Sequence, residues 1–276
     1  MPSHVIVGSS RGIGYGFLEQ LSKDPANTII GTVRNLEATQ KKVNADGLKN
    51  VTVLQADLTD YNSLLAAAKQ AAAVLPDGAV DYLWLNGAYI SPSTGNRFFD
   101  EYTPEQWPEL LEELQTSFST NVFGVINAIN AFLPLVLKST TKKVITISTG
   151  LADDSLTNKL GIWESAPYSA SKAAVNTIVA KWSARYRSQG VLFLALSPGL
   201  VYHGQEGSCC PKPLLTCISK HDFHTADANE YVFLTYRRSS SAARTEVLHR
   251  QPQHGRPNQH GAVYHRHAQD RLGLYC

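Results

Sequence analysis

Cysteine is missing from the first 208 residues of this 276-residue chain, and all four cysteines lie in its last quarter. A disulfide framework is not expected, because we expect the chain to be cytosolic and such frameworks belong to secreted proteins. The cysteines and the eight histidines beyond residue 201 also lack the C-x-x-C and H-x-x-x-H spacing of a zinc site. We therefore expect no bound metal.

Long uninterrupted apolar runs are lacking as well. The apolar stretches at residues 66–75 and 125–137 are broken by Lys, Gln, Asn or Pro, and both are too short to cross a bilayer. They predict buried helices and no contact with a membrane. A strand pattern begins at residue 4, so we expect no signal peptide and a cytoplasmic location.

An excess of one sign of charge is lacking, because 25 Lys and Arg are balanced by 23 Asp and Glu, for a formal net charge of +2. No basic stripe interleaved with aromatic residues is present, so a nucleic-acid partner is not expected. A chain of this length can bury a substantial core in one large domain.

Six short apolar runs alternate with helical patterns over the first 201 residues. This alternation predicts right-handed crossovers and an α/β fold, a doubly wound, Rossmann-like parallel sheet in a single domain. A polar or glycine-rich motif follows each run, at the carboxyl ends of strands where open α/β sheets bind ligands. The runs occupy residues 4–7, 27–33, 51–55, 80–85, 143–147 and 191–196, and helical stretches such as 61–75 and 103–138 separate them.

The first of these motifs is a glycine turn, G-x-x-x-G-x-G, formed by Gly8, Gly12 and Gly14. It stands between the first strand and a helical pattern at residues 15–21. Glycines there let the backbone turn tightly and approach a pyrophosphate, whose charge meets the positive end of the helix. The spacing differs from the commoner G-x-G-x-x-G, and alone it also fits a plain strand-to-helix turn.

Tyr168 and Lys172 form a second informative motif, because a spacing of four residues places both side chains on one helical face. A nearby ammonium favours the phenolate, so we expect Lys172 to lower the pKa of Tyr168 toward the range of proton exchange. An isolated Y-x-x-x-K arises readily by chance. The order of the motifs upstream distinguishes this one.

Taken in order, the motifs over residues 3–201 resemble those of the short-chain dehydrogenase/reductase family. Within that family the chain is similar to fungal ketoreductases of secondary metabolism. The resemblance implies Asn121, Tyr168 and Lys172 as catalytic residues. It also implies a cofactor site that Tyr168 and Lys172 complete, formed by Gly8, Ser10, Arg11, Gly12, Ile13, Gly14, Arg34, Asp57, Leu58, Asn86, Gly87, Ala88, Pro198, Gly199 and Val201.

The chemistry that this resemblance implies is hydride transfer between a nicotinamide and a small-molecule ketone, aldehyde or secondary alcohol. Tyr168 would exchange the proton with the substrate oxygen. Lys172 would lower the tyrosine pKa and hold the nicotinamide ribose, and Asn121 would keep a water in a proton relay. The family's helix-to-helix contacts also make a homo-oligomer through residues 121–137 an expectation.

The fourth catalytic position has two candidates, because the family's serine usually stands thirteen residues before the tyrosine. Counting back thirteen residues gives Ser155, in a polar stretch at residues 153–159 that we expect to be a loop insertion. Aligning the fifth strand instead puts Thr149 on the serine position, with Ser148 one residue before it. A hydroxyl at a strand end is better anchored, so we expect Ser148 or Thr149 to bind the substrate carbonyl.

Arg34 indicates the choice of cofactor, because it follows the second strand at a position where an NAD site carries an acid. An arginine there, with Arg11 of the glycine turn, can hold the 2′-phosphate of NADP(H). The sequence therefore favours NADPH, with reduction as the physiological direction.

Residues 202–276 form an atypical tail to the 1–201 core. Apolar periodicity fades, no convincing seventh strand follows, and His203 occupies the position of the threonine that usually opens the family's substrate loop. Out-of-frame sequence after an intact core is the interpretation we favour, and a lineage-specific substrate lid is the alternative. The chain is then either an NADP(H)-dependent oxidoreductase or an NADP-binding protein with little turnover.

Overall fold

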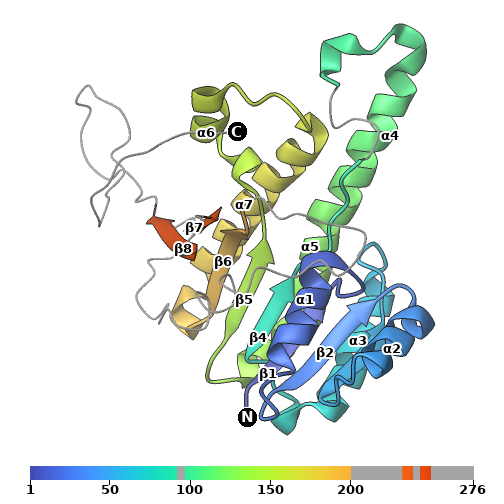
Figure 1. Ribbon diagram of the computed structural model, residues 1–276, viewed down its shortest axis with the longest axis vertical. Helices are drawn as coiled ribbons and strands as arrows, with labels where there is room; N and C mark the ends of the chain where they lie inside the picture. The colour runs from blue at the N-terminus through green and yellow to red at the C-terminus, as the bar shows by residue number, and fades with distance from the viewer. Residues whose placement is uncertain (92–96, 200–231, 239–242, 250–276) are drawn as a thin grey trace.

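The computed structural model describes residues 1–91, 97–199, 232–238 and 243–249 (Figure 1). Its strands form one sheet in the order β3-β2-β1-β4-β5-β6-β7-β8. All neighbours are parallel except β7 and β8. The strands are Ser3–Val7 (β1), Thr28–Val33 (β2), Val51–Gln55 (β3), Tyr82–Leu85 (β4), Lys143–Ile147 (β5), Leu192–Ser197 (β6), Val232–Arg238 (β7) and Ala243–His249 (β8).

The strand order reverses at β1, which pairs with β2 on one side and β4 on the other. Val5 lies opposite Ile30 in β2 and opposite Leu83 in β4. In open α/β sheets the ligand crevice lies at such a switch point, outside the carboxyl ends of the strands. The topology therefore places a binding site where the first and fourth strands end.

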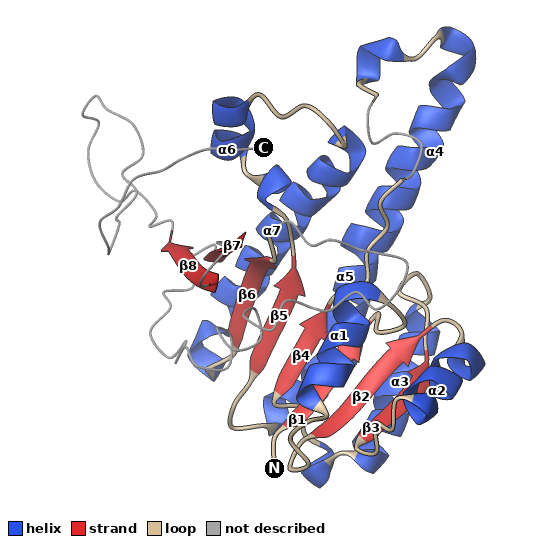
Figure 2. Cartoon of the chain, in the orientation of Figure 1, coloured by secondary structure: helices blue, strands red, loops and turns tan. Residues whose placement is uncertain are grey.

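Helices cover both faces of the sheet (Figure 2). On β1, Val5 and Val7 pack into a core with α3, α5 and α7, whereas Ile6 packs into a second core with α1 and α2. Successive side chains of a strand point to opposite faces, so this apolar run serves two cores. The helices are Gly12–Leu21 (α1), Leu36–Ala45 (α2), Tyr61–Val74 (α3), Trp107–Phe118 (α4), Gly124–Lys138 (α5), Asp154–Leu160 (α6) and Ala166–Tyr186 (α7).

One helical run, Pro104–Lys138, joins α4 and α5 through a single π-helical turn, Ser119–Phe123 (η4). Its mean hydropathy reaches 1.6, so by length and composition alone it could cross a membrane. That apolar part is 61% buried inside the fold, as in a core helix of a globular protein. The expectations of no membrane contact and of a homo-oligomer through this region stay predictions.

The structure confirms the doubly wound parallel sheet and places all six predicted strands within two residues of their expected bounds. The expected loop insertion at residues 153–159 is wrong, because α6 occupies it. Asp153 caps that helix by accepting a hydrogen bond from the Leu156 amide, and Gly161 ends it in the left-handed conformation. Both are ordinary helix-end signals, so the stretch did carry a helical pattern.

The absence of a seventh strand is also wrong. β7 continues the sheet parallel to β6, with Leu196 opposite Val232, and β8 returns antiparallel to it. His203, Cys209, Cys210, Cys217 and Cys276 lie outside the described residues. The choice between an out-of-frame tail and a substrate lid therefore stays a prediction.

Candidate active site

The predicted motifs meet at the carboxyl edge of the sheet, because each follows the end of a parallel strand. Gly8 follows β1, Arg34 follows β2, Asp57 lies two residues beyond β3, Asn86 follows β4 and Ser148 follows β5. Pro198 and Gly199 follow β6, and Val201 lies outside the described residues. The carboxyl ends of the strands point toward α6 and the beginning of α7 (Figure 2).

The glycine turn and the Asn-Gly-Ala motif pack against each other as one unit. Gly8 has a φ of 85°, and a Cβ added to it would lie 2.5 Å from the Cα of Gly87. The Asn86 side chain donates to the Gly8 carbonyl at 2.8 Å. A Cβ on Gly14 would lie 2.1 Å from that same carbonyl. Only a residue without a Cβ fits these contacts, which explains why both motifs carry glycine.

The first turn of α1 can receive an anion. Arg11 stands at the N-cap with an extended backbone and no capping side chain, and no acidic residue lies in the first turn. Ser10 and Arg11 are exposed, and Gly12 and Ile13 begin the helix. Amide N–H groups of a first helical turn have no partner within the helix, and the helix end is positive. This donor set fits a dinucleotide pyrophosphate.

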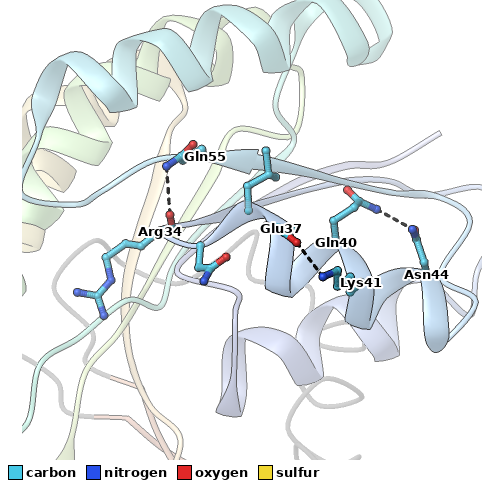
Figure 3. Close-up of a pocket in the computed structure, with 8 residues that line it drawn as sticks. Arg34, Glu37, Gln40, Lys41, Asn44 and Gln55 are labelled. Atoms are coloured by element: carbon cyan, nitrogen blue, oxygen red, sulfur yellow. Dashed lines mark hydrogen bonds and ion pairs between the residues drawn. The ribbon is translucent and has the colours of Figure 1, made fainter.

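Arg34 lies at the end of a groove of about 690 Å³ between α2 and the ends of β2 and β3 (Figure 3). Its side chain extends away from Lys41, which pairs with Glu37 at 2.7 Å. Among the described residues the Arg34 guanidinium bonds to no other side chain, and it is exposed. It is available to an anionic ligand at that end of the groove. The groove is lined by Arg34, Asn35, Leu36, Glu37, Gln40, Lys41, Asn44 and Gln55.

Asp57 and Leu58 form the turn beyond β3. The Asp57 carboxylate accepts from both the amide and the hydroxyl of Thr59 at 2.8 Å, which fixes the turn. Leu58 packs so tightly that a Cβ on Gly87 would lie 2.4 Å from its Cδ1. Ala88 lies beside Gly87 and is exposed. Leu58 is thus joined to the glycine turn through Gly87.

Tyr168 and Lys172 lie one turn apart near the start of α7, as predicted. Lys172 is 1% exposed, and its ammonium donates to the Ile147 carbonyl at the end of β5 at 2.7 Å. The ammonium lies 5.9 Å from the centre of the Tyr168 ring. The lysine is therefore fastened to the strand and lies beside the tyrosine.

The pKa of Tyr168 moves opposite to the expected direction. Burial raises the pKa of Tyr168 to about 12 and lowers the pKa of Lys172 to about 8. Burial disfavours the charged form of each group, and the Lys172 ammonium donates its short hydrogen bond to the Ile147 carbonyl. In this structure Tyr168 is a neutral phenol over the physiological range, the form that can donate a proton.

Asn121 lies in the π-helical turn and is completely buried. Its carboxamide accepts from the Tyr89 amide at 2.7 Å and donates to the Tyr89 carbonyl at 2.9 Å and to the Ser171 hydroxyl at 2.9 Å. Ser171 in turn donates to the Tyr168 carbonyl at 2.7 Å. The Asn121 side chain thus joins the loop after β4 to the helix that carries Tyr168.

Ser148 and Thr149 have different surroundings, although both directly follow β5. The buried Ser148 hydroxyl donates to the Asn176 carboxamide at 2.6 Å. The half-buried Thr149 hydroxyl accepts from the Leu151 amide at 3.3 Å, so its own proton is not used in that bond. Ser155, the candidate from counting, lies in the first turn of α6.

Sequence reasoning missed Ser171 and Asn176. Ser171 stands directly before Lys172, and Asn176 lies four residues after it, on the same helical face. That spacing was a usable signal. Within the described ranges no group of three His, Cys, Asp or Glu could hold a metal ion.

The chain matches the family model described as short chain dehydrogenase over residues 3–207. The chain belongs to the short-chain dehydrogenase/reductase family. Short-chain dehydrogenase/reductase iacC of Pestalotiopsis fici is 45% identical over 219 residues, which cover 77% of this chain and 78% of that one. Short chain dehydrogenase virK of Hypocrea virens is 42% identical over 221 residues, covering 78% and 79%. The protein is therefore an oxidoreductase of this family.

Solved short-chain dehydrogenase/reductase structures share the fold. The NADPH-bound carbonyl reductase from chicken fatty liver superposes with a TM-score of 0.69 at 22% identity, covering 85% of this chain and 96% of that one. An NADPH-bound short chain oxidoreductase from Pseudomonas aeruginosa, with an atypical catalytic centre, gives 0.58 at 23% identity and covers 74% and 73%. These likenesses confirm the Rossmann-like sheet.

Proposed function

We propose that the protein is an NADP(H)-dependent reductase of a small-molecule ketone or aldehyde, with Tyr168 as proton donor. The observation that carries the proposal is the placement of Tyr168 and Lys172 on one face of α7, beside the hydroxyl-bearing end of β5. A solved protein with the same fold, the carbonyl reductase from chicken fatty liver, binds NADPH and supports this class of activity.

NADPH, when bound, supplies the hydride, and the chain supplies placement and electrostatics. The free amides of α1 would hold the pyrophosphate, and Arg34 with Arg11 would hold the 2′-phosphate. Lys172, whose ammonium is anchored on Ile147, would hold the nicotinamide ribose. Each of these residues lies at the carboxyl edge of the sheet.

Tyr168 transfers the proton, and Thr149 stabilises the charge on the substrate oxygen. As negative charge grows on the substrate oxygen, the Tyr168 phenol donates its proton to that oxygen as general acid. Thr149 donates a hydrogen bond to the same oxygen, because its proton is not used in the bond to Leu151. The bond from the Ser148 hydroxyl to Asn176 supports assigning this role to Thr149. A phenol whose pKa is about 12 is fully protonated before each turnover.

The alternative of an NADP-binding protein with little turnover rested on an abnormal C-terminal region. β7 pairs with β6 in parallel and extends the sheet beyond β5 and β6, which favours the enzyme over the alternative. NADPH binding without NADPH consumption across a broad panel of ketones and aldehydes would instead support the alternative.

Tyr168→Phe tests the proposal directly. This variant keeps the ring but loses the proton donor, so turnover should fall by about a hundredfold or more while NADPH affinity stays unchanged. Lys172→Ala should lower both turnover and NADPH affinity. Steady-state rates and NADPH titration measure the two effects. An unchanged rate in Tyr168→Phe would remove this mechanism.

A further inference from the structure

The end of β5 is attached to α7 at two adjacent residues. The Ile147 carbonyl accepts from the Lys172 ammonium at 2.7 Å, and the Ser148 hydroxyl donates to the Asn176 carboxamide at 2.6 Å. We name these two hydrogen bonds the β5–α7 clasp. Lys172 is wholly buried and Ser148 is 5% exposed, so neither group can exchange its partner freely for water.

The clasp lies along the helical face that carries the chemistry. Tyr168, Lys172 and Asn176 follow one another at intervals of four residues, and side chains at that spacing lie above one another on one face. With a rise of about 1.5 Å per residue, the two attachment points lie roughly 6 Å apart along α7. Two attachments on one face prevent both sliding and rotation of the helix against the strand.

Thr149, the residue after Ser148, depends on this attachment. Its hydroxyl and that of Tyr168 must bond the same substrate oxygen, yet Thr149 lies two residues beyond β5 and Tyr168 lies on α7. A misplacement of about 1 Å between reacting groups can lower a rate by about a hundredfold. Their relative position is set where the strand meets the helix.

We propose that Asn176 is a positioning residue, which fixes Tyr168 against Thr149 by accepting the Ser148 hydroxyl. This role rests on the proposed function of Tyr168 and Thr149. It also assigns the two neighbouring hydroxyls separate tasks, with Ser148 holding the helix and Thr149 binding substrate. A carboxylate at this position would lie one turn from the Lys172 ammonium and would raise the pKa of Lys172, whereas the neutral amide does not.

Kinetics of three variants test the role. Asn176→Ala should lower kcat by about tenfold and leave the KM for NADPH within about twofold, because positioning changes the reacting geometry and not cofactor binding. Asn176→Asp keeps an oxygen acceptor, so it should restore most of kcat. Its charge should also move the alkaline limb of the pH profile, governed by Lys172, to higher pH. Thr177→Ala, an exposed neighbour on the same helix, is the matched control and should behave as the unmutated protein.

The outcomes separate the clasp from the proposed function. Asn176→Ala with an unchanged kcat, or Asn176→Asp no better than Asn176→Ala, would overturn the positioning role. If the unmutated protein reduces no carbonyl, the proposed function fails and the positioning role fails with it. The clasp itself is then judged separately, by unfolding Ser148→Ala, Asn176→Ala and the double variant in denaturant. If Ser148 and Asn176 are coupled, the double variant should be about as stable as the less stable single variant, whereas additive losses would show that the Ser148–Asn176 bond does not join β5 to α7.

Discussion

The two halves of the sheet that form the site are assembled by different kinds of contact. In the cofactor half, comprising the glycine turn and β1 to β3, backbone approaches backbone so closely that a Cβ on Gly14 would lie 2.1 Å from the Gly8 carbonyl. In the catalytic half, comprising β5, β6 and α7, buried polar side chains make the contacts, as Lys172 does with Ile147 and Ser148 does with Asn176.

This difference teaches where each half is vulnerable. Contacts between backbones fail when any side chain is added, because a close-packed interior cannot absorb the extra volume. Buried hydrogen bonds fail when one partner is removed, because the remaining polar group is left unsatisfied. The cofactor half should thus reject enlargement, and the catalytic half should reject truncation.

Gly14→Ala should have the largest effect. Its methyl group would press on the Gly8 carbonyl, and overpacking of this kind costs about 1–3 kcal/mol even where side chains can yield. We expect lower thermal stability together with loss of measurable NADPH binding. Gly47→Ala is the control, because its Cβ would meet open space, although the positive φ of Gly47 adds a backbone strain that Gly14, within α1, does not have. If Gly14→Ala binds NADPH as well as Gly47→Ala does, the cofactor half is not limited by packing.

Thr149→Ala tests truncation in the catalytic half. Loss of a hydrogen-bond donor to a developing oxyanion typically lowers kcat by about a hundredfold, and we expect a loss of that order. Thr149→Ser keeps the hydroxyl and should retain most of the activity. Steady-state kinetics at saturating NADPH distinguish the two variants. Equal activity in Thr149→Ala and the unmutated protein would show that a group other than the Thr149 hydroxyl bonds the substrate oxygen.

Arg34→Asp should weaken NADPH much more than NADH. A charge-assisted hydrogen bond to the 2′-phosphate contributes about 1.5–3 kcal/mol, which corresponds to roughly a tenfold to hundredfold change in affinity. Lys41→Gln removes a positive charge from the same groove, but that lysine is paired with Glu37 and should matter little. Equal affinity of the unmutated protein for both cofactors would show that Arg34 and Arg11 are bystanders.

The smallest effect on activity is expected at His4, a buried polar contact far from the carboxyl edge of the sheet. Burial lowers the pKa of His4 to about 4, and its Nδ1 accepts from the Trp84 indole at 3.3 Å. The unfolded chain binds a proton here near pH 6.5 and the folded chain does not. The free energy of unfolding should therefore decrease as the pH is lowered from 6.5 to 4, by up to about 1.4 kcal/mol per pH unit.

Denaturant unfolding across this pH window measures the dependence, and His4→Gln should remove it while NADPH consumption at pH 7 stays unchanged. A His4→Gln variant with the same pH dependence as the unmutated protein would assign the loss of stability to other groups. Such a result would leave the comparison of the two halves intact, since His4 lies near the amino end of β1 and takes part in neither set of contacts.

The sequence by itself determined the parallel sheet, the strand bounds and the edge at which the motifs meet. Apolar runs of four to seven residues followed by glycine or polar residues leave few other topologies, because both faces of each strand must be buried. The helix α6 was missed although Asp153 and Gly161 mark its ends. β7 and β8 were missed because residues 232–249 carry no clear apolar alternation.

Only the tertiary structure decided how the hydroxyls and charges are used. Ser148 and Thr149 are adjacent in sequence and chemically alike, but packing gives Ser148 the partner Asn176 on another element. The pKa of Tyr168 depends on burial, which no local spacing reveals. Hydrogen bonds between residues 28 or 50 positions apart exist only after the chain has folded, so the partners of Ser148 and Asn121 could not be predicted from sequence.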